Sequence, residues 1–300
     1  MKLFIKHILL FGLLFFIVEK GLYYFIQNAP KKEYDKRLEL ILEGKMEKDI
    51  VIIGSSRGAN NVSAKQLEEK TGFSCYNLSY RGSSVIFHEF ILKTLLLHNN
   101  KPKKVLLVID NGYQFIKEHS LHFRFDRLNP LKNYGYIHEK LIENNKKSFL
   151  SNFFYSFKVN REDFSLKPKR IYEIDVMTSH GSKLLKAKNN EKLEYINEVK
   201  KYEINEEELA KLEAFNSIQR MCSNNDIELY LVFTPGLMTF DTDFLKRFKK
   251  LVSPDEKIIV YDTLDERYKE KDIYRDHTHM FSKGAKIFTS EISDFINSNK

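Results

Sequence analysis

The chain has 300 residues, of which 42% are hydrophobic and 30% are charged, and its formal net charge is +8. This composition is that of a globular protein, and the length allows one large α/β domain or two small ones. The Lys residues are scattered among Glu residues and no nucleic-acid-binding motif is present, so we expect no nucleic-acid partner. Cys75 and Cys222 form no CxxC pair and are expected to be structural thiols.

The amino-terminal segment is strongly apolar. Lys2 and Lys6 precede an uninterrupted apolar run over residues 8–18, and two charged residues separate this run from a second apolar stretch. Counted over residues 3–26 the segment is long enough to cross a bilayer, which needs about 20 residues, and no small-x-small cleavage site follows it. We therefore expect residues 1–27 to be a transmembrane anchor that places the following domain outside the cytoplasm, in an extracytoplasmic or periplasmic location.

A polar helix or linker over residues 28–47 leads to the first predicted strand, residues 50–53. This run (IVII) is apolar on both faces and stops at Gly54-Ser55-Ser56, as in a buried strand of a parallel sheet. In open α/β sheets ligands bind at the carboxyl ends of the strands. Ser56 can stand at the mouth of the next helix, where amides stabilise negative charge, but a serine here is also a common helix cap.

Four further apolar segments predict strands of the same sheet, at residues 73–78, 104–109, 228–233 and 257–261. Helices are predicted between and after them, at residues 63–71, 85–98, 206–224, 241–251 and 285–297. Alternation of this kind is typical of a parallel sheet with right-handed crossovers. We expect a three-layer α/β/α domain over residues 48–300 with about five parallel strands.

Residues 119–205 interrupt the alternation. This segment is rich in Lys, Asn, Phe and Tyr, and helices are predicted near residues 136–145 and 189–201. We interpret it as an irregular insertion within the domain, either over the site or as a small subdomain.

The second informative stretch is the carboxyl-terminal loop over residues 276–284 (DHTHMFSKG), in which Asp276 stands three residues before His279. This spacing lets the carboxylate fix the tautomer of the imidazole and stabilise the imidazolium that forms when His279 accepts a serine proton. Ser56 supplies that proton in this hypothesis, because both segments fall on the same edge of the predicted sheet. Ser55 replaces it if the turn is rotated by one residue.

These segments resemble the sequence blocks of the SGNH (GDSL-like) hydrolase superfamily. Gly54-Ser55-Ser56 stands in place of the Gly-Asp-Ser block, and residues 77–82 (NLSYRG) resemble the second block. Asp276-x-x-His279 matches the last block in type and spacing. The third block departs from the family pattern Gly-x-Asn-Asp, because the third strand is followed here by Asp-Asn-Gly.

The resemblance implies a flavodoxin-like SGNH fold and a serine esterase that acts on acyl esters without a cofactor. It assigns Ser56 as nucleophile, His279 as base and Asp276 as the residue that orients it. It also implies oxyanion donors at the two positions that match the family, with the amide of Gly82 in the second block and the side chain of Asn111 as candidate in the third.

Three further expectations concern partners and substrate. Arg57, beside the predicted nucleophile, is a candidate for binding an anionic substrate group. A membrane anchor joined to such a domain is similar to extracytoplasmic proteins that assist teichoic-acid D-alanylation and alginate O-acetylation. This similarity implies an acyl ester of a cell-envelope polysaccharide or glycolipid as substrate and a membrane-bound acyltransferase as partner.

Other functions use the same residues differently. An O-acyltransferase would employ the same Ser-His-Asp group with a sugar hydroxyl in place of water, and a non-catalytic module of an envelope acylation complex would retain the fold with a degraded third block. Asp272, Asp276, His277 and His279 have side chains that suit a metal ion. A His-x-His pair without a distant third ligand indicates such a site only weakly, so no metal is expected.

Overall fold

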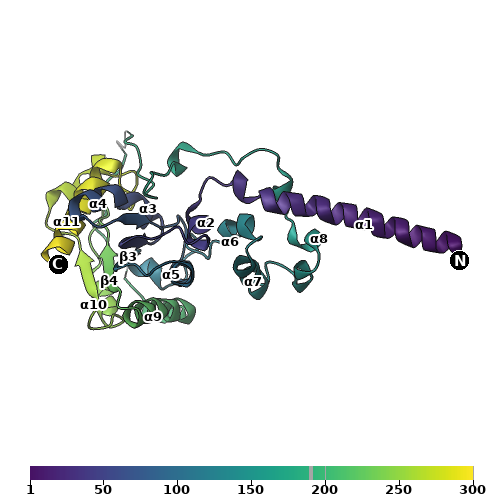
Figure 1. Ribbon diagram of the computed structural model, residues 1–300. Coiled ribbons are helices and arrows are strands. Elements are labelled where there is room, and N and C mark those ends of the chain that lie inside the picture. The colour runs from purple at the N-terminus through teal and green to yellow at the C-terminus, as the bar shows by residue number, and fades with distance from the viewer. Residues whose placement is uncertain (189–191, 200, 300) are drawn as a thin grey trace. The chain divides into compact units, whose positions relative to one another are not determined.

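The computed structural model describes residues 1–188, 192–199 and 201–299 (Figure 1). The chain divides into two compact units. Unit 1 comprises Met1–Glu39 and Arg124–Ile171, and unit 2 comprises Leu40–Phe123 and Tyr172–Lys300. The boundary between Glu39 and Leu40 falls within the short helix α2 (Arg37–Leu42).

Unit 2 contains a five-stranded sheet with the order β2-β1-β3-β4-β5, in which all neighbouring strands run parallel. The strands are β1 (Ile50–Ile53), β2 (Cys75–Asn77), β3 (Lys104–Ile109), β4 (Glu228–Phe233) and β5 (Lys257–Val260). The predicted α/β fold with five parallel strands is confirmed, although β2 is shorter than the predicted range 73–78.

Helices cover both faces of this sheet, which explains why its strands are apolar on both sides. Figure 1 shows α3, α4 and α11 on one side of the sheet and α5 and α9 on the other. The helices of unit 2 are α3 (Ser56–Asn61), α4 (Ala64–Thr71), α5 (Val85–His98), α9 (Leu209–Asn224), α10 (Thr242–Lys249) and α11 (Ser282–Ser298). Short turns of helix are η2 (Asn111–Gln114), η6 (Glu173–Asp175), η7 (Ile204–Glu206), η8 (Glu266–Lys269) and η9 (Lys271–Ile273).

The two faces of the sheet bury different side chains. Ile50 and Ile52 of β1 belong to a core cluster that includes Ile292 of α11. A cluster of aromatic rings formed by β4, α9, α10 and the segment after η2 fills another part of the core, and the rings of Phe233 and Phe248 lie 5.0 Å apart, edge to face. Burial of one large apolar side chain stabilises the folded state by about 1.5–3 kcal/mol. These clusters therefore stabilise the sheet whose carboxyl edge carries the site.

Unit 1 consists of one long helix and several short ones. These are α1 (Lys2–Asn28), η1 (Pro30–Lys32), α6 (Phe125–Leu128), η3 (Asn129–Leu131), α7 (Gly135–Glu143), η4 (Phe149–Asn152), α8 (Tyr155–Lys158) and η5 (Arg161–Phe164). Glu19 of α1 accepts hydrogen bonds from the amides of Tyr155 (2.7 Å) and Ser156 (3.2 Å). The side chain of Lys132 is fully buried and its ammonium group pairs with Asp163, so unit 1 contains a buried charged pair.

The transmembrane anchor predicted for residues 1–27 is not supported. The helix forms, but no helix in the described part of the chain combines the length and the apolar character needed to cross a membrane. The uninterrupted apolar run over residues 8–18 extends only about 16 Å as a helix, whereas the hydrocarbon core is about 30 Å thick.

The irregular segment divides between the two units. Residues 124–171 of the segment fold with α1, whereas its residues 119–123 and those from 172 on belong to unit 2. The helix predicted near residues 136–145 is confirmed as α7. The helix predicted near residues 189–201 is not found in the described residues 192–199, and residues 189–191 and 200 lie outside the described part.

Candidate functional site

The turn after β1 places two serines at the carboxyl edge of the sheet. Gly54 begins the turn, and its carbonyl accepts hydrogen bonds from the amide of Tyr80 (2.9 Å) and the hydroxyl of Ser83 (3.1 Å). A Cβ at Gly54 would lie 2.9 Å from the Cβ of Val108, so this position has no room for a side chain. The turn is therefore held against β3 and against the loop that follows β2.

The two serines have different partners. Ser56, the first residue of α3, lies with its Oγ 2.7 Å from Nε2 of His279. Ser55 caps the helix by accepting a hydrogen bond from the amide of Arg57 (3.3 Å), and its hydroxyl donates to Asp110 (2.6 Å). The structure thus brings Ser56, and not Ser55, to the imidazole.

His279 is held by Asp276 on its other side. Nδ1 of His279 lies 2.9 Å from both carboxylate oxygens, and Asp276 Oδ1 also accepts from the amides of Thr278 and His279 (3.0 Å each). Burial opposes ionisation of Asp276, but the hydrogen bond and charge of His279 outweigh it and hold the pKa of this carboxyl well below its usual range. An ionised Asp276 accepts the Nδ1 proton, which leaves Nε2 as the acceptor for the Ser56 hydroxyl.

A buried ion pair lies behind the serine turn. Asp110 follows β3 directly, and its Oδ1 is 3.7 Å from Nε of Arg57; both side chains are almost fully buried. Burial raises the pKa of Asp110, and the charge of Arg57, the hydrogen bond from Ser55 and the charge of His279 offset this only in part. Arg57 therefore faces a carboxylate of the protein. Asp110 is a site residue that sequence reasoning missed, although a charged residue directly after an apolar strand at this edge is a usable signal.

The two predicted oxyanion residues are not hydrogen-bonded to Ser56 or His279 within the described residues. Gly82 has the left-handed backbone that favours glycine (φ 68°), and its carbonyl accepts from the amide of His122 (3.0 Å). Asn111 also has a positive φ of 53°, and its buried Oδ1 has no hydrogen-bond partner in the described chain. Both residues follow strands that flank β1, so they lie at the same edge as Ser56.

Asn61 is a second residue that sequence reasoning missed. It is the last residue of α3 and is fully buried. Its Nδ2 donates to the carbonyl of Thr278 (2.9 Å), and its Oδ1 accepts from the amide of Met280 (2.9 Å). Nothing in the local sequence distinguishes Asn61 from its neighbour Asn60, so only the tertiary structure reveals this contact.

Part of the irregular segment borders the site. The amide of Lys183 donates to the carbonyl of Ala59 in α3 (2.7 Å), and the amide of Ser282 donates to the carbonyl of Leu185 (2.8 Å). His277 lies with Nε2 3.1 Å from the carbonyl of Glu194. Within the described residues no group of three or more His, Cys, Asp or Glu side chains is arranged to hold a metal ion.

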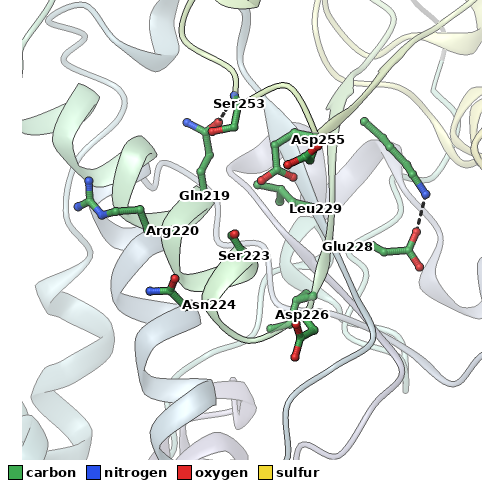
Figure 2. A pocket seen from close by; sticks show the side chains of 12 residues that line it. Gln219, Arg220, Ser223, Asn224, Asp226, Glu228, Leu229, Ser253 and Asp255 are labelled. Atoms are coloured by element: carbon green, nitrogen blue, oxygen red, sulfur yellow. Dashed lines mark hydrogen bonds and ion pairs between the residues drawn. The ribbon is translucent and has the colours of Figure 1, made fainter.

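A cavity of about 340 Å³ lies at the opposite edge of the sheet (Figure 2). It is lined by the end of α9 and the start of β4, including Asp226 and Glu228. Ser56 follows the carboxyl end of β1, whereas this cavity surrounds the amino end of β4, a parallel strand of the same sheet. The cavity therefore takes no part in the Ser56 site.

Comparison with known proteins adds little to this geometry. The sequence matches no protein-family model and no curated protein. Among solved structures, the chain is similar to a Bacteroides fragilis protein described as a "putative acylhydrolase", with a TM-score of 0.42 and 10% sequence identity over 89% of this chain and 97% of that one. A similarity at this level transfers neither a fold nor an activity to this chain.

Proposed function

We propose that the protein is a serine hydrolase that cleaves acyl esters. The observation that carries this proposal is the unbroken hydrogen-bonded line from Ser56 Oγ through His279 to Asp276, with distances of 2.7 and 2.9 Å. A serine hydroxyl is a weak nucleophile on its own, and an imidazole backed by a carboxylate is the arrangement that activates it.

The proposed reaction has two halves. Ser56 Oγ attacks the ester carbonyl while Nε2 of His279 takes the hydroxyl proton and returns it to the leaving alcohol. Water then attacks the acyl-enzyme, again losing a proton to His279, which restores Ser56. Asp276 stabilises the imidazolium that forms in each half.

The proposed oxyanion donors are the amides of Ser56 and Gly82, with the side chain of Asn111. Two observations support Gly82: its loop is fixed to the serine turn through the hydrogen bond from Tyr80 to Gly54, and its N–H donates to no group in the described chain. Removing one donor of this kind costs about 3–4 kcal/mol of transition-state stabilisation.

The proposed substrate is an acyl ester of a cell-envelope polysaccharide or glycolipid, and a membrane-bound acyltransferase is the proposed partner. Both rest on the family resemblance of the sequence. Partial exposure of the His279 and Asp276 side chains, at 24% and 47%, is consistent with a bulky ester that reaches the imidazole from solvent. If a sugar hydroxyl replaced water in the second half-reaction, the same residues would transfer the acyl group, and product analysis separates these outcomes.

Fluorophosphonate labelling of the full chain tests the proposal. We expect covalent labelling of the wild type, no labelling of Ser56→Ala and labelling slowed about 10³-fold or more in His279→Ala. Ser55→Ala is the matched control, because it removes the neighbouring hydroxyl and should retain labelling. A folded wild type that takes no label, or label retained by Ser56→Ala and lost by Ser55→Ala, would contradict the assignment, and the first result would favour an interaction module.

We also propose that α1 binds the surface of an anionic membrane. The large apolar side chains between Leu3 and Val18 each expose 43–71% of their surface, and Lys2, Lys6 and Lys20 lie on the same helix. An apolar helix with basic charge binds anionic lipid through apolar burial and electrostatic attraction.

Flotation of the full chain with phosphatidylglycerol vesicles tests this membrane proposal. We expect the wild type to float with the vesicles, and the variant Leu9→Asp/Phe11→Asp to lose about tenfold or more in binding, because charge on the apolar surface opposes insertion. Leu264→Asp changes an apolar residue of unit 2 that is 84% exposed and should bind as the wild type does. A wild type that stays with the lipid-free fraction would overturn the proposal.

A further inference from the structure

We propose that Asn61 is a positioning residue that holds His279 against Ser56, an inference that rests on the hydrolase function proposed above. The Asn61 carboxamide contacts the backbone on both sides of His279, at the carbonyl of Thr278 and the amide of Met280, each at 2.9 Å. Its side chain is fully buried, so it acts through the loop and does not touch the substrate.

The placement of Asn61 links the two halves of the site. Ser56 is the first residue of α3 and Asn61 is the last, so one helix of six residues carries both the serine and the contact to the histidine loop. A helix of this length extends about 9 Å and keeps the relation between its two ends fixed. The helix α3 and the two Asn61 hydrogen bonds thereby fix the distance between Ser56 and His279.

The chemistry of the carboxamide suits this role. One side-chain oxygen accepts from Met280 and one side-chain nitrogen donates to Thr278, so the two peptide groups around His279 are fixed in opposite hydrogen-bonding senses. Aspartate at position 61 would keep the acceptor and lose the donor, and leucine would lose both at similar volume. The backbone of His279 itself pairs with the amide of Arg275 (2.8 Å), so Asn61 supplies the restraint from the serine side.

Loss of this restraint is expected to act on the chemical step. A displacement of about 1 Å in a reacting group can reduce the rate about 10²-fold, because the near-attack geometry is lost while substrate contacts remain. We therefore expect Asn61→Leu to lower kcat about 10²-fold with KM changed less than about twofold, and Asn61→Asp to fall between this variant and the wild type.

The chain provides a matched control in Asn99. Its Nδ2 donates to the carbonyl of Ile41 (2.9 Å), and its Oδ1 accepts from the amide of Met46 (2.8 Å), so it is also an Asn bridge between backbone groups. It follows α5 near the amino-terminal edge of the sheet, remote from Ser56. Asn99 is only partly buried, so Asn99→Leu should lower the Tm less than Asn61→Leu does, and it should leave kcat within about twofold of the wild type.

The experiment measures kcat and KM of the full chain with p-nitrophenyl acetate, together with hydrogen exchange of the Met280 amide. The expected result is reduced kcat and at least about tenfold faster Met280 exchange in Asn61→Leu, with neither change in Asn99→Leu. Unchanged kcat in Asn61→Leu, or equal loss of kcat in the two leucine variants, would overturn the proposal; if Asn61→Leu fails to fold, Asn61→Asp is judged by the same criteria. A wild type without turnover would refute the hydrolase function and with it the positioning role, and the Met280 exchange would then show whether the contact is structural only.

Discussion

Replacing Asp276 with asparagine is expected to lower kcat for ester hydrolysis by about 10³- to 10⁴-fold while KM changes little. Oδ1 of Asp276 accepts the amides of Thr278 and His279, so an asparagine will keep its oxygen on these amides. The retained oxygen and the new Nδ2 then both lie 2.9 Å from Nδ1 of His279, so a neutral acceptor and a donor replace two charged acceptors. A donor at that position favours the tautomer protonated on Nε2, which cannot accept the Ser56 proton.

Steady-state kinetics of Asp276→Asn at pH 8 measures this effect. Asp265→Asn is the matched control, because Asp265 also accepts an amide two residues later, from Arg267 at 3.0 Å, outside the Ser56 site. It should retain kcat. A kcat for Asp276→Asn within about tenfold of the wild type would show that Asp276 does not orient His279 in the reaction.

Removing the carboxylate of Asp163 is expected to destabilise unit 1 by about 3–5 kcal/mol, because the buried ammonium group of Lys132 is left without its partner. Burial already lowers the pKa of Lys132, while the hydrogen bond and charge of Asp163 raise it. Without Asp163 the folded-state pKa falls further below the unfolded value. Between the two pKa values the folded state binds fewer protons than the unfolded chain, so the loss of stability is full below the folded-state pKa of Lys132 and shrinks as the pH rises toward about 10.

The free energy of unfolding of unit 1 can be followed by hydrogen exchange of its amides in Asp163→Ala at pH 7 and pH 9.5. The double variant Lys132→Met/Asp163→Ala should recover much of the loss, because the uncompensated charge is gone. A loss below about 1 kcal/mol in the single variant, or a loss independent of pH, would show that the Lys132 ammonium group is accommodated without Asp163.

The sheet could be predicted because its strands have a recognisable residue pattern in the sequence. Apolar runs such as residues 50–53 and 104–109 have β-branched character and end at small or polar residues, and the alternation with helices implies parallel strands. Ser56, Asp276 and His279 were predictable for a related reason. Ser56 follows the turn after a strand, and the spacing of Asp276 and His279 in the loop before the last helix matches a known sequence block, so motif and topology together indicate one edge.

The remaining features depend on contacts between distant residues. Asp110 and Asn61 are single polar residues whose partners lie 55 and more than 200 positions away, and no local pattern encodes such a contact. The same limit explains why the packing of α1 with residues 124–171 was missed, since Glu19 meets Tyr155 across 136 positions. The expectation of a transmembrane helix rested on the length and apolar content of residues 3–26, although Glu19 and Lys20 interrupt the apolar residues.

The separation of Ser56 and His279 by 223 positions has a consequence for synthesis of the chain. Domains form from the amino-terminal side as the chain leaves the ribosome. The serine turn, β1 and β3 are synthesised early, whereas the loop over residues 276–280 is synthesised after most of unit 2. The imidazole therefore reaches the serine only after the 223 positions between them have been synthesised, and a product terminated before residue 279 carries the nucleophile without its base.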